Sequence, residues 1–338
     1  MAQVIVHIGQ NKTGSTTIQR WLKSNAAALA RQGIKYDPLE AGSDRLPHLT
    51  GFQALSRHIN GLPVESDVIR FRYGIDGPEA QAHVVDEFET RATASFGTGD
   101  FETYVISSEA LCVTLHDKAT IEKFIGFLER HFDRVQVTAY VRDQVDWMPS
   151  AYSEGIKSGH SESLAAYLKR APMKNLNAFA VTWCNAIGAD RFNIRLLEPD
   201  YLTNGDLLSD FAAVVGADAE HTTKPPPQNE GFGRFGLGVM RMVNRSERVL
   251  PLRSSTRLRL FARKHLRKLP ATGKVVLSSE QARQVAMSHA VSNENLRKRF
   301  FPERPILFAK SARILEDIKH PGRAPAAGSE ETPVAAMR

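Results

Sequence analysis

The sequence predicts an α/β protein with three layers, in which helices cover both faces of a parallel sheet. Short runs of apolar and β-branched residues recur along residues 4–197, as in strands that are buried on both faces. Stretches with apolar residues at helical spacing separate these runs, and such alternation is typical of parallel sheets. Apolar residues make up 42% of the 338 positions, which is enough to form the core of such a protein.

Five segments have the composition of buried strands, because apolar and β-branched residues follow one another closely. The expected strands are residues 4–8, 34–36, 103–107, 135–141 and 193–197. Apolar residues at helical spacing predict helices over residues 15–33, 84–94, 119–131 and 207–215. Residues 37–78 are rich in glycine, proline, histidine and charge, and they predict a long, partly helical excursion.

The chain is expected to consist of a core, a basic and mainly helical extension that completes the domain, and a disordered tail. These parts are residues 1–222, 223–318 and 319–338. Residues 241–268 contain ten lysines and arginines. The same stretch has apolar residues that would form the stripe of a basic amphipathic helix, namely Leu258, Phe261, Ala262, Leu266 and Leu269.

The formal net charge of +7 favours anionic partners, although it is also compatible with a merely soluble surface. The charge within residues 241–268 predicts contact with an anionic glycan or a membrane surface, and a solvated helix face is the alternative. Nucleic acid is not expected as a partner, because this stretch has no interleaved aromatic residue beyond Phe261.

Cysteine usage and the lack of targeting signals predict a cytoplasmic protein. The two cysteines are too few for a disulfide framework, and no CxxC pair indicates a zinc site. No apolar run approaches the roughly 18 residues of a membrane span. The N-terminus also lacks the pattern of a signal peptide.

The segment between the first expected strand and the first expected helix has the composition of an anion-binding loop. Residues 7–17 read His-Ile-Gly-Gln-Asn-Lys-Thr-Gly-Ser-Thr-Thr. A turn that opens a helix presents backbone N–H groups and the positive end of the helix dipole to an anion. Gly14 permits close approach of the backbone, and Lys12 adds a positive charge. Hydroxyl donors follow on Ser15, Thr16 and Thr17. The alternative is an ordinary turn in which Ser15 caps the helix.

This loop is not a Walker A motif, in which a lysine directly follows the second glycine. Gly9 and Gly14 have the required spacing, but Ser15 stands where the lysine belongs and Lys12 lies upstream of Gly14. The arrangement Lys-Thr-Gly-Ser-Thr instead resembles the 5′-phosphosulfate loop of sulfotransferases that use 3′-phosphoadenosine 5′-phosphosulfate (PAPS). The matching residues are Lys12, Thr13, Gly14, Ser15 and Thr16.

A second motif of that family also has a counterpart in this chain. The family binds the 3′-phosphate of PAPS with an arginine at the end of a strand and a serine eight residues later, at the start of a helix. Here Arg142 follows the expected strand 135–141, and Ser150 comes eight residues later. Arginine suits this role because its guanidinium is always charged and binds phosphate through two donors. An ion pair of Arg142 with Asp143 or Asp146 is the alternative.

The resemblance covers residues 3–217 and implies a P-loop-NTPase-like sulfotransferase fold. It implies PAPS as the donor, adenosine 3′,5′-bisphosphate (PAP) as the product and no metal, with a carbohydrate hydroxyl as the expected acceptor. The residues implied in donor binding are Lys12, Thr13, Gly14, Ser15, Thr16, Thr17, Arg142 and Ser150. Residues 229–233 are the candidate for the family's C-terminal glycine-rich loop.

Catalysis requires that charge on the leaving phosphate be neutralised, for which Lys12 is expected, and that a base take the acceptor's proton. The family places a histidine or glutamate at one of two positions. One is the end of the strand before the arginine strand, where Glu109 lies, and the other is the segment after the second strand, which contains Glu40 and His48. Glu109 is the first choice, followed by His48 and Glu40. A capping or ion-pairing role for Glu109 and a solvated position for His48 are the alternatives.

Two other functions compete with sulfuryl transfer. A nucleotide or small-molecule kinase with a divergent P-loop needs a hydroxyl for Mg²⁺ directly after Gly-Lys, and an aspartate after a buried strand. Asp143 follows such a strand, but Arg142 intervenes and Lys12 is misplaced. A non-enzymatic protein would bind nucleic acid or acidic glycan through residues 241–268.

Overall fold

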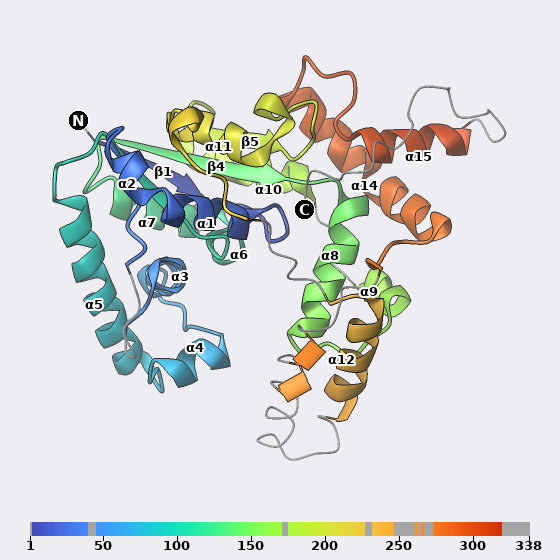
Figure 1. The fold of residues 1–338 in the computed structure, drawn as a ribbon, viewed down its shortest axis with the longest axis horizontal. Coiled ribbons are helices and arrows are strands. Elements are labelled where there is room, and N and C mark those ends of the chain that lie inside the picture. The colour runs from blue at the N-terminus through green and yellow to red at the C-terminus, as the bar shows by residue number, and fades with distance from the viewer. Residues whose placement is uncertain are drawn as a thin grey trace. The chain divides into compact units, whose positions relative to one another are not determined.

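The computed structural model contains two compact units, shown in Figure 1. The sheet unit comprises Met1–Arg142 and Leu176–Pro225, and the helical unit comprises Asp143–Asn175 and Pro226–Arg338. The structure describes residues 2–39, 45–170, 175–226, 232–246, 261–262, 265–266 and 273–319. Glu40, most of the basic stretch 241–268 and the expected tail beyond Lys319 lie outside the described residues.

The sheet unit is built on five parallel strands in the order β2-β3-β1-β4-β5. The strands are β1 (Gln3–His7), β2 (Ile34–Lys35), β3 (Thr103–Ser107), β4 (Arg134–Val141) and β5 (Phe192–Leu196). All five predicted strands are confirmed, and their ends shift by no more than about one residue.

The strand order brings the ends of β1, β3 and β4 together at one edge of the sheet. The chain leaves β1 toward β2 on one side, whereas it leaves β3 and β4 toward the other side. The carboxyl end of β1 is therefore the point where the connections diverge, which is where open α/β sheets bind ligands. The register pairs His7, the last residue of β1, with Ser107 of β3 and Thr138 of β4.

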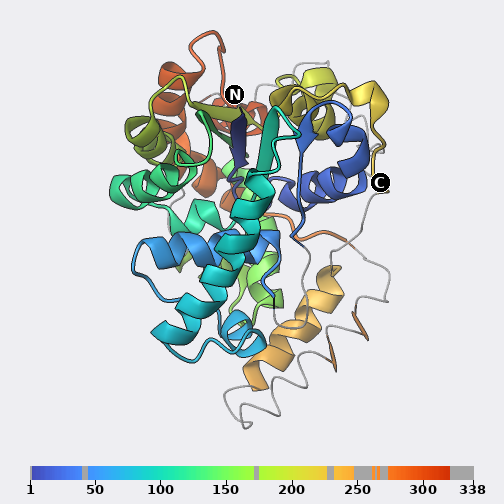
Figure 2. The same cartoon turned by 90° about the vertical axis from the view of Figure 1, so that its left-hand side faces the viewer.

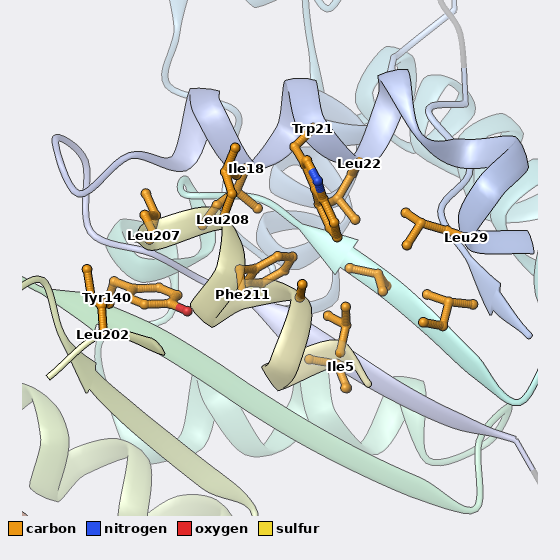
Figure 3. Packing of buried hydrophobic residues seen from close by; sticks show 14 residues of the cluster. Ile5, Ile18, Trp21, Leu22, Leu29, Tyr140, Leu202, Leu207, Leu208 and Phe211 are labelled. Atoms are coloured by element: carbon orange, nitrogen blue, oxygen red, sulfur yellow. The ribbon is translucent and has the colours of Figure 1, made fainter. Parts of the chain in front are cut away.

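One face of the sheet is covered by α1 (Ser15–Ser24), α2 (Ala26–Ala30) and α11 (Leu207–Val215). The core between them appears in Figure 3, where side chains of α1 point toward those of α11 above β1 and β4. Trp21 of α1 meets Phe211 of α11 edge to face, with ring centroids 6.1 Å apart. The predicted helix 15–33 is in fact two helices, because Asn25 interrupts it and its side-chain amide donates to the carbonyl of Trp21.

Helices of the 37–128 region and one later helix flank the sheet on the other side, giving the predicted three-layer α/β arrangement. They are α3 (His48–Ile59), α4 (Asp67–Arg72), α5 (Pro78–Phe96), α6 (Leu111–Thr114), α7 (Lys118–Leu128) and α10 (Leu176–Ile187). In Figure 2, α3 and α5 lie side by side, in agreement with their packing. Two short 3₁₀ helices, Thr203–Gly205 and Ala219–His221, flank α11.

A buried carboxylate ties β4, β5 and α11 together. Asp210 is fully buried and accepts hydrogen bonds from the Tyr140 hydroxyl at 2.6 Å, the Arg195 Nε at 2.6 Å and the Thr203 N–H at 3.0 Å. Because a buried charge is tolerated only when it is paired and hydrogen-bonded, this network fixes α11 against the strands.

The helical unit consists of five described helices. They are α8 (Gln144–Lys157), α9 (Leu164–Arg170), α12 (Arg234–Ser246), α14 (Ser279–Phe300) and α15 (Ala309–Lys319). Of the expected apolar stripe, Ala262 and Leu266 pack against buried residues of α8 and α12. Phe261 is 62% exposed and lies outside this packing, because its ring contacts His265 instead. Leu258 and Leu269 lie outside the described residues.

No helix among the described residues is both long enough and apolar enough to cross a membrane.

Candidate functional site

The loop between β1 and α1 has a backbone shaped for an anion. Lys12 and Gly14 have positive φ angles of 68° and 90°, and the intervening Thr13 does not. Alternation of left- and right-handed residues turns successive N–H groups toward one concave side, a geometry known as an anion-binding nest. Helix α1 begins at Ser15, with Gly14 as its N-cap and no side chain capping it. The alternative of a turn capped by Ser15 is therefore wrong, and the first-turn N–H groups face the loop.

Both the backbone conformation at position 14 and the lack of room for a side chain there require glycine. Its φ of 90° is unfavourable for any residue with a side chain. In addition, a Cβ at this position would lie 2.2 Å from the Cδ2 atom of Leu207, at the start of α11. The loop therefore rests directly on α11, which the Asp210 network holds in place.

Three buried polar atoms without hydrogen-bond partners gather in this loop. They are Nε2 of His7, Oε1 of Gln10 and Oγ of Ser15, on residues that are 0%, 1% and 2% exposed. Eight such side-chain atoms occur among the described residues, so three of them fall within nine consecutive positions. An unpaired buried polar group costs about 1–3 kcal/mol, and a cluster of them indicates that the loop is built for a polar ligand.

Gly9 lies between two of these polar groups. A Cβ on Gly9 would be 2.5 Å from Nε2 of His7 and 2.8 Å from Oγ of Ser15. Both polar atoms therefore converge on the same small space beside the Gly9 backbone, and a side chain at this position would displace them.

Arg142 reaches the loop from the neighbouring strand. It directly follows β4, is half-buried, and its Nη1 donates to the carbonyl oxygen of Lys12 at 3.5 Å. The structure thus brings together two predicted site residues that are 130 positions apart. The carboxylates that competed for Arg142 have other partners: Asp143 accepts from the Ser311 hydroxyl at 2.6 Å, and Asp146 accepts from Lys310 at 2.5 Å.

Ser150 does not lie at the start of a helix, so that expectation is wrong. It occupies the second turn of α8, half-buried, with its hydroxyl 3.5 Å from the carbonyl oxygen of Asp146. The helix begins at Gln144 because the Asp143 side chain accepts the N–H of Val145 and caps it. Pro149, which in sequence resembles a helix start, is instead accommodated inside the helix.

Glu109 lies in the turn that follows β3, next to the loop. The N–H of Ser108 donates to the carbonyl oxygen of His7 at 3.0 Å, which continues the pairing of β3 with β1 past their last residues. Glu109 is half-buried. Glu109 thus lies near the edge shared by β1, β3 and β4, and its role as the base stays a prediction; Glu40 lies outside the described residues.

His48 is buried and has hydrogen bonds at both ring nitrogens, so it is not the solvated histidine that was the alternative. Its Nε2 accepts the N–H of Ser107 at 3.1 Å, and its Nδ1 therefore carries the proton and donates to the carbonyl oxygen of Asp37 at 2.6 Å. Burial lowers the pKa of His48 to about 4. In this arrangement the ring joins the end of β3 to the segment after β2 and has no free lone pair.

Acid is expected to destabilise the sheet unit before most carboxylates titrate. Burial lowers the pKa of His7 to about 3 and that of His48 to about 4, from 6.5 for an unperturbed histidine. Below pH 6.5 the unfolded chain therefore binds more protons than the folded chain, so stability falls as the pH falls. The slope from each histidine rises toward about 1.4 kcal/mol per pH unit as the pH falls from 6.5 toward 5.

Urea unfolding between about pH 7 and pH 5 measures this slope. The variant His48→Gln, which keeps an amide in place of the ring, should remove one histidine's share of it. A slope that is equal in the variant and the natural chain would contradict the assignment.

Sequence reasoning did not place His7 and Gln10 in the site. The structure buries His7 between Phe211 and Tyr140, with ring centroids 5.3 Å and 6.0 Å away. The signal that identifies both residues is a polar side chain with an unpaired buried atom, which becomes visible only in three dimensions.

Comparison with family models, with curated proteins and with solved structures gave no match for this chain.

Proposed function

We propose that this protein is a sulfotransferase that moves the sulfuryl group of PAPS to an acceptor hydroxyl, with a carbohydrate as the acceptor class. The observation that carries the proposal is the meeting of Arg142 with the Lys12 backbone, beside three unpaired buried polar atoms. Residues of the two segments that resemble phosphate-binding motifs of one family thus lie at the same sheet edge, which supports the proposal. The strand order with β1 in the centre supports a P-loop-NTPase-like sulfotransferase fold.

The loop residues divide the binding of the donor between its two charged ends. The N–H groups from Gly14 to Thr17 and the hydroxyls of Ser15, Thr16 and Thr17 bind the 5′-phosphosulfate, while the Thr13 N–H donates to the carbonyl oxygen of Gln10 at 3.3 Å and holds the turn. Arg142, with Ser150, binds the 3′-phosphate. The two groups come from different elements: the loop N–H groups lie between β1 and the first turn of α1, whereas Arg142 follows β4.

The reaction is an in-line displacement at sulfur. The acceptor oxygen forms a bond to sulfur while the bond from sulfur to the bridging oxygen breaks, and the electron pair leaves on the 5′-phosphate of PAP. Lys12 neutralises the charge that develops there. Glu109 takes the proton of the acceptor hydroxyl. We favour Glu109 over His48 because both nitrogens of His48 already have partners.

A transfer assay with two labelled donors tests this proposal against the kinase alternative. The purified protein is incubated with a panel of glycans and either sulfur-35 PAPS or ATP labelled on its γ-phosphate with Mg²⁺. The proposal predicts transfer of label from PAPS, independent of Mg²⁺. Transfer from ATP alone would establish a kinase and overturn the proposal.

Removal of the Arg142 guanidinium is expected to weaken donor binding through the 3′-phosphate alone. Loss of a charge-assisted partner costs about 1.5–3 kcal/mol. Calorimetry should therefore show that Arg142→Ala binds PAP more weakly, with a smaller effect for Ser150→Ala. Affinity for adenosine 5′-phosphate, which lacks the 3′-phosphate, is the control. If Arg142→Ala loses equal affinity for both ligands, Arg142 contacts another part of the donor.

We further propose that α12 and the basic stretch bind an anionic membrane surface. The exposed face of α12 combines Arg234 and Arg245 with Phe235 and Met242, which are 68% and 71% exposed. Residues 241–268 add ten positive charges in sequence against the single acidic residue Glu247. Apolar side chains beside arginines suit a lipid interface better than a glycan, which offers no apolar phase.

Vesicle sedimentation tests this partner. The protein should sediment with vesicles that contain phosphatidylglycerol, but not with pure phosphatidylcholine, and high salt should release it. Phe235→Ser and Met242→Ser should each weaken binding several-fold, whereas Met287→Ser, at an exposed (59%) methionine on α14, should not. Retention on heparin without vesicle binding would assign the surface to an anionic glycan and contradict the proposal.

A further inference from the structure

We infer that His7 is a positioning residue that directs the hydroxyl proton of Ser15 toward the anion bound in the loop. The inference rests on the proposed function in one respect, since it requires that the loop bind the 5′-phosphate or phosphosulfate of the donor. It adds a residue of β1 to the site and a hydrogen-bonded chain from β3 through β1 to the loop.

The ring of His7 is held so that its two nitrogens face different elements. Nδ1 lies 2.9 Å from the hydroxyl oxygen of Ser107 on β3. Nε2 lies on the loop side, where it and Oγ of Ser15 both approach the backbone of Gly9. Phe211 meets the ring edge to face at 5.3 Å. The residue is 0% exposed, and its hydrogen bond to Ser107 keeps Nδ1 toward β3.

Burial fixes the charge of His7, which leaves only the position of its single proton open. With a pKa near 3 the imidazole is neutral at physiological pH, so one nitrogen donates and the other accepts. If the proton were on Nδ1, the ring would donate to Ser107 and Nε2 would accept a proton from its loop neighbour. If the proton is on Nε2, the Ser107 hydroxyl donates to Nδ1 and Nε2 donates toward Ser15.

An anion in the loop selects the second arrangement. A phosphate or sulfate oxygen carries no proton, so Ser15 serves it only by donating its hydroxyl proton. Oγ of Ser15 is then free to accept from Nε2 of His7. All donors consequently point the same way, from Ser107 to His7, from His7 to Ser15 and from Ser15 to the anion. The atoms of His7 and Ser15 that lack partners without a ligand both gain one when the anion binds.

The position of the proton is measured directly by nitrogen-15 NMR of the histidine-labelled natural protein, with PAP as the ligand. Eleven histidines occur in the chain, and the spectrum of His7→Gln identifies the signal of His7. The inference predicts that bound protein has the proton on Nε2 and a bare Nδ1. A proton on Nδ1 while PAP is bound overturns the inference and leaves the proposed function intact. Absence of any PAP binding overturns both.

Affinity for PAP provides a second test through three variants. His7→Gln places an amide N–H near the position of Nε2 and should keep PAP affinity within about threefold of the natural protein. His7→Asn does not reach that position, so its PAP affinity should fall about tenfold. Ser15→Ala should lose a similar factor. The double variant of His7→Asn with Ser15→Ala should bind no more weakly than either single variant, because both changes break one chain.

Arg142→Ala is the matched control for coupling. Its effect should add to that of His7→Asn, since Arg142 serves the 3′-phosphate and shares no hydrogen bond with His7 in the proposed site. If His7 had a merely structural role, His7→Gln and His7→Asn would weaken PAP binding equally. The effect of His7→Asn would then add to that of Ser15→Ala. Either of those two results contradicts the inference.

Discussion

Lys12→Ala is expected to lower kcat by at least about 10²-fold, because the lysine stabilises charge that exists mainly in the transition state. The side chain of Lys12 is half-buried in the loop. Its left-handed conformation, with φ of 68°, is equally unfavourable for alanine and lysine, so the unfolding free energy should change little. Initial rates with labelled PAPS at saturating donor, combined with a melting temperature, separate the two effects.

Two further variants sharpen this test. Lys12→Arg retains the charge and should recover part of the lost rate. Lys23→Ala removes an exposed lysine from the last turn of the same helix and should leave kcat unchanged. A folded Lys12→Ala protein with nearly natural kcat would show that the leaving phosphate is neutralised elsewhere.

Glu109→Gln is expected to lower kcat by about 10²–10⁴-fold, because the amide keeps the shape of the carboxylate but accepts no proton. Its affinity for PAP should stay nearly unchanged, since the base serves the acceptor and not the donor. The measurement is kcat with the best acceptor, alongside calorimetric titration of PAP. The matched control is Glu102→Gln, which changes an exposed glutamate just before β3 and should leave kcat equal to that of the natural protein.

Variants of the other two candidate bases, His48 and Glu40, test the assignment of Glu109 as the base. His48→Gln breaks two buried hydrogen bonds and should therefore lower stability more than kcat in the folded fraction. Glu40→Gln should affect neither. A large kcat loss in folded His48→Gln or Glu40→Gln, with natural kcat in Glu109→Gln, would move the base to the segment after β2.

The strands were predictable from sequence because a strand buried on both faces leaves a continuous apolar run. Residues 103–107 and 207–215 match their elements end to end. Helix boundaries were less accurate where a side chain overrode the pattern. Asn25 breaks the first helix, and Asp143 caps α8 so that it begins at Gln144, six residues before Ser150, which the family motif places at a helix start.

The turn between β1 and α1 was predictable because its residues are contiguous, whereas its surroundings were not. No local pattern states that β1 lies between β3 and β4, and this order alone brings Arg142 to the carbonyl of Lys12. The roles of His48 and His7 were also hidden. Histidine is common both in solvent and in cores, and only the hydrogen bonds to Ser107 distinguish these two.

We propose that one sheet edge recognises a nucleotide phosphorylated at both the 3′ and 5′ positions. Calorimetric titration tests this recognition most directly. The protein is titrated without metal against PAP and adenosine 5′-phosphate, and with Mg²⁺ against ATP. We predict that PAP binds at least about tenfold more tightly than adenosine 5′-phosphate, as expected for a charge-assisted contact to the 3′-phosphate. Tight binding of ATP with Mg²⁺ and none of PAP would contradict the account.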